Sequence, residues 1–241
     1  MSKVLVLRLA GPMQSWGSSS RFTRRSTEAF PTKSGIVGLL AAAQGRRRTD
    51  PIEDLVDLKM AVRVDQPGEL LRDFHTAHRG VVSMPLSDRF YLSDAVFAAF
   101  VAGPEEIIDG LADAIRCPRF PLYLGRRACP PTMPLFLQLH DGPVQDIIEG
   151  LPWQAALFYQ RQHKRESHLS LRVIADKGMV NTSEWTVHSL QDVPVSFDSE
   201  RRLYRQRQVE EMRVLVPNPA HEASKNSEAE APLNHDPMEV L

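Results

Sequence analysis

An alternation of cations and aromatic rings near the N-terminus is typical of proteins that hold single-stranded nucleic acid. Arginine side chains neutralise backbone phosphates, and flat side chains stack on unpaired bases. The stretch begins with an amide and an indole beside a glycine, and it continues to a lysine and a serine. Its candidate RNA-binding residues are Gln14, Trp16, Gly17, Arg21, Phe22, Arg24, Arg25, Lys33 and Ser34. The alternative for Trp16 is a place in the core, as a lid over the following helix.

A second loop, around Gly125, combines backbone freedom with two adjacent arginines. Because Gly125 has no Cβ atom, backbone N–H groups and the guanidinium groups of Arg126 and Arg127 can approach one phosphate together. Residues 116–127 hold four arginines and no acid, and the first 48 residues hold nine basic residues and one acid. Since a guanidinium fork can grip two phosphate oxygens, these clusters favour an RNA-binding surface. The alternative is a solvated surface that is simply rich in arginine.

Two histidines three residues apart raise a catalytic alternative. His75 or His78 could act as the general base of metal-free RNA cleavage, with Tyr91 or Lys33 stabilising the developing charge. Residues three apart on a strand do not share a face, which favours an exposed arm without a catalytic role. In that interpretation the arm adds RNA contacts through His75, Arg79, Arg89 and Tyr91.

Signature motifs of common enzyme classes are missing. The sequence has no GxxxxGK[ST] phosphate loop, no GxSxG elbow, no HExxH pair and no GxGxxG after a strand. Its acids lack metal-ligand spacing, and its two cysteines complete no zinc site. We therefore expect no catalytic residues, no metal ion and no cofactor.

The composition is that of a folded protein with an acidic tail. The 241 residues are 42% hydrophobic and 24% charged, with a net charge of −1, which excludes a disordered, collagen-like or coiled-coil chain. The longest apolar runs are far shorter than the ~20 residues that cross a bilayer, and no signal peptide opens the chain, so we expect a soluble cytoplasmic protein. Residues 217–241 hold five acids and four prolines, which predicts a disordered tail.

The expected elements follow the order strand, helix, strands, helix, strand. The pattern predicts a strand over 3–10, a long loop over 11–31, a helix from a Thr32 cap to Gly45, strands over 58–64 and 70–74, an exposed arm over 75–90, a strand over 90–101, a helix between Pro104 and Pro118 and a strand over 134–139. This order predicts an α+β, ferredoxin-like fold, with two helices on one face of an antiparallel sheet. The sheet lacks the aromatic-rich central strand of RNA-recognition domains, so we expect binding through loops.

The chain after residue 140 is predicted to form a smaller, β-rich part. It contains an amphipathic run over 144–151, a strand over 169–175, a hairpin-type turn over 176–178 and a last strand that ends at 216. We therefore expect a ferredoxin-like domain over 1–140, a β-rich part over 141–216 and the acidic tail over 217–241.

Five separated blocks of the sequence resemble one family. They are LAGPMQSWG (9–17), FPTKSGIVGLL (30–40), DFHT (73–76), RFYLSDA (89–95) and PRFPLYLGRRACP (118–130). Their residues and order are similar to those of the Cas-five family of CRISPR-associated RAMP proteins, in its type I-E form. The resemblance spans residues 3–136, and the acidic tail departs from the family's pattern.

The resemblance implies a ferredoxin-like (RRM-like, RAMP) body with a protruding thumb, which would be the arm over 75–90. It implies a place at one end of the Cascade surveillance complex, in antiviral defence, where the chain caps the backbone and holds the 5′ handle of the CRISPR RNA. The implied partners are this RNA, the repeated backbone subunit and the large subunit. Target DNA would be contacted only indirectly, and no membrane is implied.

The sequence leaves three hypotheses about function open. In the first, a non-catalytic subunit binds RNA through about six cations, so log affinity falls with log salt at a slope near −4. In the second, suggested by relatives of another subtype, the chain is a metal-independent endoribonuclease that processes precursor CRISPR RNA, whereas in the type I-E form a separate subunit cuts. In the third, the chain is a scaffold that touches only protein.

Overall fold

The computed structural model describes residues 2–17, 24–76, 78–79, 82–83, 85–180, 186–197 and 203–222. Of the candidate site residues, Arg21 and Phe22 lie outside these ranges. For Arg24 and Arg79 only the backbone is described. Most of the predicted tail, from residue 223 onward, also lies outside them.

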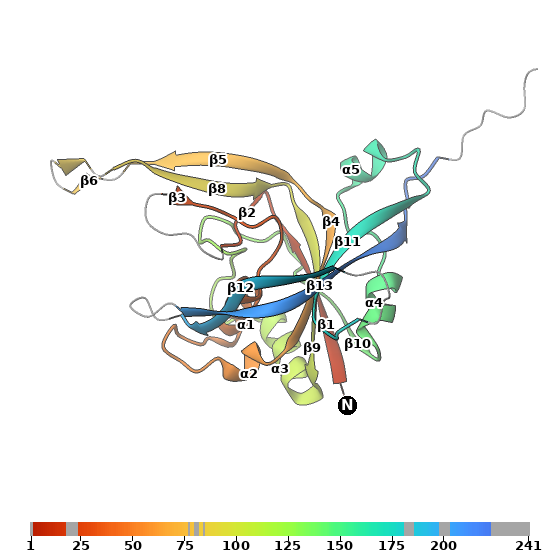
Figure 1. Ribbon diagram of the computed structural model, residues 1–241, viewed down its shortest axis with the longest axis horizontal. Coiled ribbons are helices and arrows are strands. Elements are labelled where there is room, and N and C mark those ends of the chain that lie inside the picture. Colours follow the sequence, from red (N-terminus) through yellow and green to blue (C-terminus); the bar gives the residue numbers. More distant parts are fainter. Residues whose placement is uncertain are drawn as a thin grey trace, which may run out of the picture.

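One large antiparallel sheet forms the centre of the molecule (Figure 1). All neighbouring strands run antiparallel. From edge to edge the order is β10 (Phe136–Asp141), β1 (Ser2–Ala10), β9 (Val96–Pro104), β4 (Lys59–Gln66), β11 (His168–Asp176), β13 (Leu203–Pro217) and β12 (Thr186–Ser196). The predicted strands over 3–10, 58–64, 134–139 and 169–175 are confirmed to within two residues at each end.

The two predicted helices, α1 (Lys33–Gln44) and α3 (Glu105–Arg116), pack side by side on one face of this sheet. The Thr32 hydroxyl accepts a hydrogen bond from the Gly35 N–H group, and Gly45 ends α1 with a φ of 83°. These are the start and stop signals that the sequence predicted. Alternate residues of β1, among them Leu5 and Leu7, point into the core beneath the helices.

A second core lies on the opposite face of the sheet. There α4 (Val144–Gly150) and the segment that leads to α5 (Leu157–Gln162) cover apolar residues of the central strands. Arg63 and Asp65, both fully buried, form an ion pair of 2.8 Å at this face. The Arg63 guanidinium also donates to the carbonyls of Ile148, Leu151 and Pro152, so it fixes the end of α4 to the sheet.

The predicted arm is the outer part of a longer hairpin. Strands β5 (Glu69–His75) and β8 (Ser87–Ser93) pair along their whole length and project from the body (Figure 1). A short ladder of β6 (His78–Arg79) and β7 (Val82–Ser83) lies at the tip. Two short strands, β2 (Met13–Gln14) and β3 (Arg24–Arg25), pair with the other edge of β8. Residues 69–93 are called the arm below.

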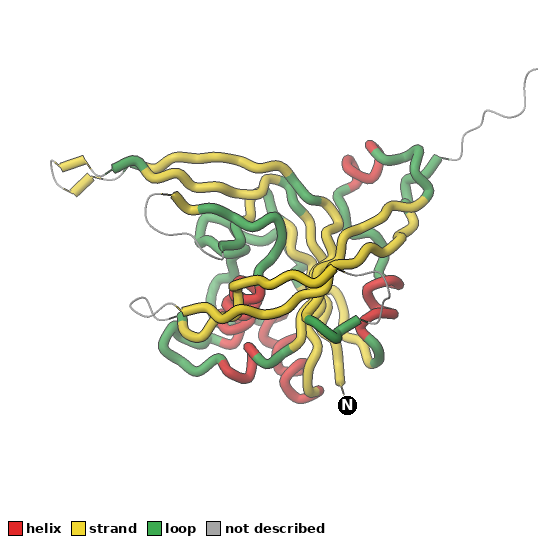
Figure 2. Tube along the Cα trace, viewed as in Figure 1, coloured by secondary structure: helices red, strands yellow, loops and turns green. Residues whose placement is uncertain are grey.

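The structure corrects several predicted elements. The strand expected over 90–101 is two strands of different sheets, because Asp94 turns the chain with a φ of 54°. The loop over 11–31 contains β2 and β3. The turn over 176–178 does not join neighbouring strands, since β13 lies between β11 and β12. The amphipathic run predicted over 144–151 forms helix α4, and the described residues also include two short helices that were not predicted, α2 (Glu53–Val56) and α5 (Figure 2).

The C-terminal part extends the central sheet. Strand β11 pairs directly with β4, through Val173 opposite Arg63, so the two sides of the predicted boundary at residue 140 share one sheet. Strand β12 was not predicted, and β13 is 15 residues long. In the part of the chain that the structure describes, no helix has the length and apolar character needed to cross a membrane.

Candidate nucleic-acid interface

Arg126 joins three segments that are far apart in the sequence. Its guanidinium donates to the Phe90 carbonyl of β8 at 3.1 Å, and to the carbonyls of Arg25 and Ser26 at 2.8 and 3.3 Å. The same group lies over the Tyr91 ring, 4.8 Å from the centroid. Arg126 was predicted to bind phosphate, but both of its terminal nitrogens already donate to backbone carbonyls. Its role in this structure is to hold the 117–131 loop and β3 against β8.

This clamp holds two other predicted arginines, Arg25 and Arg89, side by side. In the parallel β3–β8 pair, Arg25 lies opposite Arg89, so both side chains share one face of the small sheet. Arg126 lies on that same face, because it covers Tyr91, two residues beyond Arg89. Arg127 follows in the loop and is exposed, as is Arg25. We use the name arginine face for Arg25 and Arg89 together with Arg127, the exposed neighbour of Arg126 in the loop.

Arg89 carries a donor that the protein leaves unused. Its Nε atom is buried and has no hydrogen-bond acceptor within the described residues. Buried donors in folded proteins are nearly always paired, so the polar contacts of Arg89 are incomplete in the described part of the chain. A phosphate oxygen can pair with this guanidinium once the side chain turns toward solvent.

The arm's histidines lie on its exposed outer part. His75 Nε2 lies 2.7 Å from the Asp73 carboxylate, and both side chains are nearly half exposed. Asp73 faces Arg89 across the β5–β8 pair, so His75 and Asp73 share the arginine face. His78 is exposed at the tip.

Two predicted contacts with bases are part of the core. Trp16 is fully buried, and its ring lies against the backbone of Gly35 in α1, where a Cβ atom would come within 2.6 Å of it. Gln14 is also fully buried, with its amide donating to the carbonyls of Leu9 and Ala95 and accepting from the Trp16 indole. In this conformation neither side chain can reach a base, so the alternative of a core lid describes Trp16.

Tyr91 and Gly125 also have structural roles. Tyr91 is 3% exposed beneath Arg126, so its ring is covered on that side. At Gly125, which has a φ of 87°, a Cβ atom would lie 1.8 Å from the Ser15 carbonyl oxygen. The glycine is therefore needed for close packing of two backbones. Gly17 is exposed at the end of the same segment.

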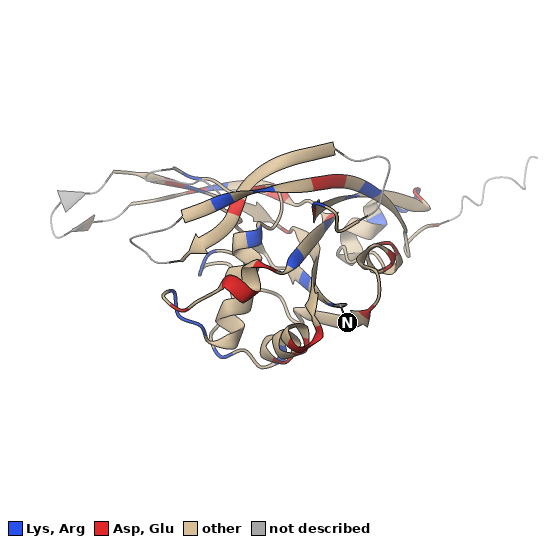
Figure 3. Cartoon of the chain, turned by 60° about the horizontal axis from the view of Figure 1, so that its bottom comes forward, with Lys and Arg blue, Asp and Glu red and all other residues tan. Residues whose placement is uncertain are grey.

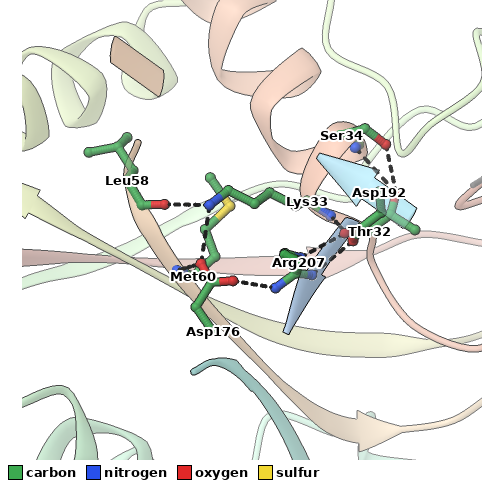
Figure 4. A network of polar contacts seen from close by, with 9 residues as sticks. Thr32, Lys33, Ser34, Leu58, Met60, Asp176, Asp192 and Arg207 are labelled. Atoms are coloured by element: carbon green, nitrogen blue, oxygen red, sulfur yellow. Dashed lines mark hydrogen bonds and ion pairs between the residues drawn. The ribbon is translucent and has the colours of Figure 1, made fainter. Parts of the chain in front are cut away.

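Lys33 belongs to a buried ionic network (Figure 4). Its ammonium donates to the Leu58 carbonyl at 2.8 Å and lies 3.2 Å from Asp176, whose other oxygen binds Arg207. Arg207 also binds Asp192, and the Asp192 carboxylate accepts from the Lys33 backbone N–H group. Burial lowers the pKa of Lys33, although Asp176 acts in the opposite direction. These contacts join α1 to β11, β12 and β13, and Lys33 is not available to RNA.

The same network holds Asp176 ionised. Burial alone would raise the pKa of Asp176, but the charges of Arg207 and Lys33 outweigh it and keep the pKa below its ordinary value. Ser34 is also buried next to the network, with its hydroxyl 3.2 Å from that of Thr32. The predicted contacts of Lys33 and Ser34 with RNA are therefore replaced by contacts within the protein.

Sequence reasoning missed several features of the arm. Arg72 forms an ion pair with Asp88 across the hairpin, and its side chain is two-thirds exposed. Leu70 and Phe74 flank it on the same strand, and 66% and 67% of their surfaces are exposed. Because successive side chains of a strand point to opposite faces, the spacing of Leu70, Arg72 and Phe74 could have placed these three residues on one face of β5. Figure 3 shows lysine and arginine both on the arm and in loops below the helices, so charge alone does not mark the interface.

No group of three or more His, Cys, Asp or Glu side chains with metal-binding geometry occurs among the residues that the structure describes. The chemistry available at the arginine face is thus that of guanidinium groups, one imidazole and one carboxylate. Such a set can bind a polyanion through charge-assisted hydrogen bonds.

Comparisons with known proteins agree on one family. The model of a family described as CRISPR-associated protein (Cas_Cas5) matches residues 4–210. The chain is 40% identical over 159 residues to the CRISPR system Cascade subunit CasD of Escherichia coli (strain K12), with 57% of this chain and 71% of that protein covered. A solved structure described as a CRISPR RNA-guided surveillance complex contains a chain that is 36% identical, with a TM-score of 0.75 and coverage of 92% of this chain and 95% of that one. A second, described as a crystal structure of Cas protein, is 35% identical, with a TM-score of 0.67 and coverage of 90% and 97%.

Proposed function

The chain belongs to the Cas5 (Cas-five) family of CRISPR-associated proteins, and on that premise we propose that it is the CasD subunit of a type I-E Cascade complex, where it binds CRISPR RNA. The relative from Escherichia coli supports this assignment, because it is named as that subunit. The similar chain of an RNA-guided surveillance complex supports the RNA as the ligand.

The fold proposed for this role is the ferredoxin-like RAMP fold. Four neighbouring strands of the central sheet have the spatial order β10, β1, β9, β4. Along the chain, α1 lies between β1 and β4, and α3 lies between β9 and β10. This is the connectivity of a split βαβ arrangement with both helices on one face. We propose residues 1–140 as this unit, with the arm as its thumb, and residues 141–216 as the part that extends its sheet.

The arginine face is the proposed site for the RNA backbone. The observation that carries this proposal is the pairing of Arg25 with Arg89 on one face, where Arg89 keeps an unpaired donor, with Arg127 exposed next to Arg126 in the adjoining loop. His75 lies on the same face, and Gly17 is exposed where the adjoining 18–23 segment begins. Three further cations from the sequence, Arg21, Arg24 and Arg79, stay as predicted contacts, together with Phe22 as a stacking ring.

The remaining parts of the role follow from the family. We propose that the RNA segment held is the 5′ handle, that the arm contacts the repeated backbone subunit and that the large subunit lies nearby. Target DNA is contacted only indirectly, and the complex is cytoplasmic and acts in antiviral defence. The chain itself is proposed to be a binder that does not cut RNA.

The nuclease alternative has less support from the geometry. It needs Lys33 or Tyr91 to stabilise charge beside His75. Lys33 is bound to Leu58 and Asp176 on another sheet, and Tyr91 is buried beneath Arg126. The pairing of His75 with Asp73 is the one feature in its favour. RNA that stays intact after incubation with the native chain would support the binder. RNA that the native chain cleaves and a His75→Ala variant leaves intact would support the nuclease.

The proposed site is tested by removing two exposed arginines. The Arg25→Ala, Arg127→Ala double variant should weaken binding of a labelled repeat-derived RNA, and its salt slope should be shallower by about 1.4, because each phosphate that is no longer neutralised removes ~0.7 from the slope. A matched control is Arg161→Ala, Arg165→Ala, which removes the same charge from exposed positions at α5, on the side away from the arm (Figure 1). Equal effects in the two variants would mean that net charge, and not the arginine face, binds the RNA.

A further inference from the structure

Helix α5 exposes two large apolar side chains on the side of the molecule away from the arm (Figure 1). Leu157 is 67% exposed and Phe158 is 53% exposed. The helix rests on an aromatic cluster in which Tyr159 lies 5.9 Å from Trp153 and 4.8 Å from His163, between ring centroids. The apolar pair therefore stands on a packed base, and adjacent exposed apolar groups can form part of a docking surface.

Two cations follow this apolar pair along the chain. Arg161 and Arg165 are exposed, and neither side chain has a hydrogen bond or ion pair within the described residues. The one acid of the segment, Glu166, is bound to His163 at 2.8 Å. We call Leu157, Phe158, Arg161 and Arg165 the α5 patch. Its chemistry suits a ligand that offers apolar side chains together with carboxylates.

The C-terminal end of the described chain is fastened next to the α5 patch. Asn218 donates to the carbonyl of His163 at 2.9 Å, and the Glu222 N–H group donates to the Lys164 carbonyl at 3.0 Å. The Glu222 carboxylate also pairs with the Lys164 ammonium at 3.0 Å. The described part of the chain therefore ends, at Glu222, beside the segment that carries Arg161 and Arg165.

We propose that residues 223–241 of the chain dock on its own α5 patch. These 19 residues contain four acids and one lysine, with apolar side chains among the acids at Leu233, Met238, Val240 and Leu241. A six-residue helix is about 9 Å long, and the 11 residues from 223 to 233 can span up to about 35 Å. The segment can thus bring its acids to the arginines and its apolar groups to Leu157 and Phe158.

Charge and tethering favour this occupant over a second copy of the chain. Two α5 patches facing each other would place arginine against arginine, which is unfavourable. A segment joined to the patch by a few residues has an effective concentration of about 1 mM. If the free peptide binds with a Kd of about 0.1 mM, the tethered segment occupies the patch in a ratio of about 10 to 1.

Hydrogen exchange tests the contact in the full chain. We compare exchange of the backbone amides of 157–166 in the native chain, in a chain that ends at Glu222, and in a full-length variant with Glu228, Glu230, Asp236 and Glu239 changed to glutamine. The proposal predicts exchange about tenfold faster in both variants, with unchanged exchange in β1 and β9 as the folding control. Equal exchange at 157–166 in all three proteins would overturn it.

A peptide added in trans identifies the surface. A synthetic peptide of residues 223–241 should bind the shortened chain, more weakly as salt is raised, and should not bind a shortened Leu157→Ser, Phe158→Ser variant. Binding that survives this double substitution would show that the patch is not the site and would overturn the proposal. Protection of α5 that rises with protein concentration would identify a second copy as the occupant, which also overturns it.

Discussion

The clamp role of Arg126 leads to a prediction that separates it from its neighbour Arg127. The Arg126 guanidinium makes two good hydrogen bonds, at 2.8 and 3.1 Å, and a longer one at 3.3 Å to backbone carbonyls. A hydrogen bond to a charged group contributes about 1.5 to 3 kcal/mol at full burial, but Arg126 is only half-buried. Discounted for solvent, the two good bonds and the contact with Tyr91 contribute together about 3 kcal/mol.

Arg126→Ala should therefore lower the free energy of unfolding of the native chain by about 3 kcal/mol. At 1.4 kcal/mol for each factor of ten, this corresponds to about a 150-fold increase in release of the 24–28 segment from β8. RNA binding should weaken because part of the binding energy is then needed to return Arg25 to its position opposite Arg89. The salt slope should stay the same, because Arg25 still contacts phosphate in the bound state and Arg126 binds only carbonyls. Arg126→Lys should behave in the same way, because one ammonium cannot reach all three carbonyls.

Arg127→Ala provides the comparison. The Arg127 side chain is exposed and makes no hydrogen bond or ion pair with the residues that the structure describes, so stability should be unchanged while the salt slope becomes shallower by about 0.7. Urea denaturation gives the stabilities, and RNA titrations across a salt series give the slopes. The reasoning is refuted if Arg126→Ala leaves the urea midpoint unchanged and shifts the salt slope as Arg127→Ala does.

Three further predictions concern the scaffold. Gly125→Ala should destabilise the chain by at least 1 to 2 kcal/mol, about the cost of a left-handed conformation, because its Cβ atom would also meet the Ser15 carbonyl; an unchanged urea midpoint contradicts this. Asp65→Ala leaves Arg63 buried without its partner and should cost about 3 to 5 kcal/mol, measured in the same way. Because the pKa of Asp176 is lower in the folded chain, its contribution to stability is present above pH ~4 and is lost as the pH falls further; Asp176→Asn should flatten that part of the stability profile.

Local signals allowed the main elements to be predicted from the sequence. Helix α1 has its cap at Thr32 and its left-handed stop at Gly45, so its bounds depend on residues at its own ends. The arm was predicted because turn-forming and charged residues separate two short strands. Strand β12 was missed because polar residues and Pro194 interrupt its alternation, and its pairing with β13 comes from the tertiary fold.

The site was harder to predict because its residue types have partners far away in the sequence. Lys33 looks like a phosphate contact until Asp176, 143 residues later, is placed beside it. Gln14 is likewise taken up by the Ala95 carbonyl, 81 residues away. Conversely, the sequence pointed to Arg25 and Arg89 separately, and only the β3–β8 pairing and the Arg126 clamp bring them to one surface.

The most direct test of the central claim is a titration of the purified chain with a labelled repeat-derived RNA in chelator, with binding and cleavage followed in the same samples across a salt series. Six cations would then contact phosphates, namely Arg25, Arg89, Arg127 and the predicted contacts Arg21, Arg24 and Arg79. Log affinity should fall with log salt at a slope of about −4, and the RNA should stay intact. A slope near zero, or metal-independent cleavage of the RNA, would contradict the account of this chain as a non-catalytic RNA-binding subunit.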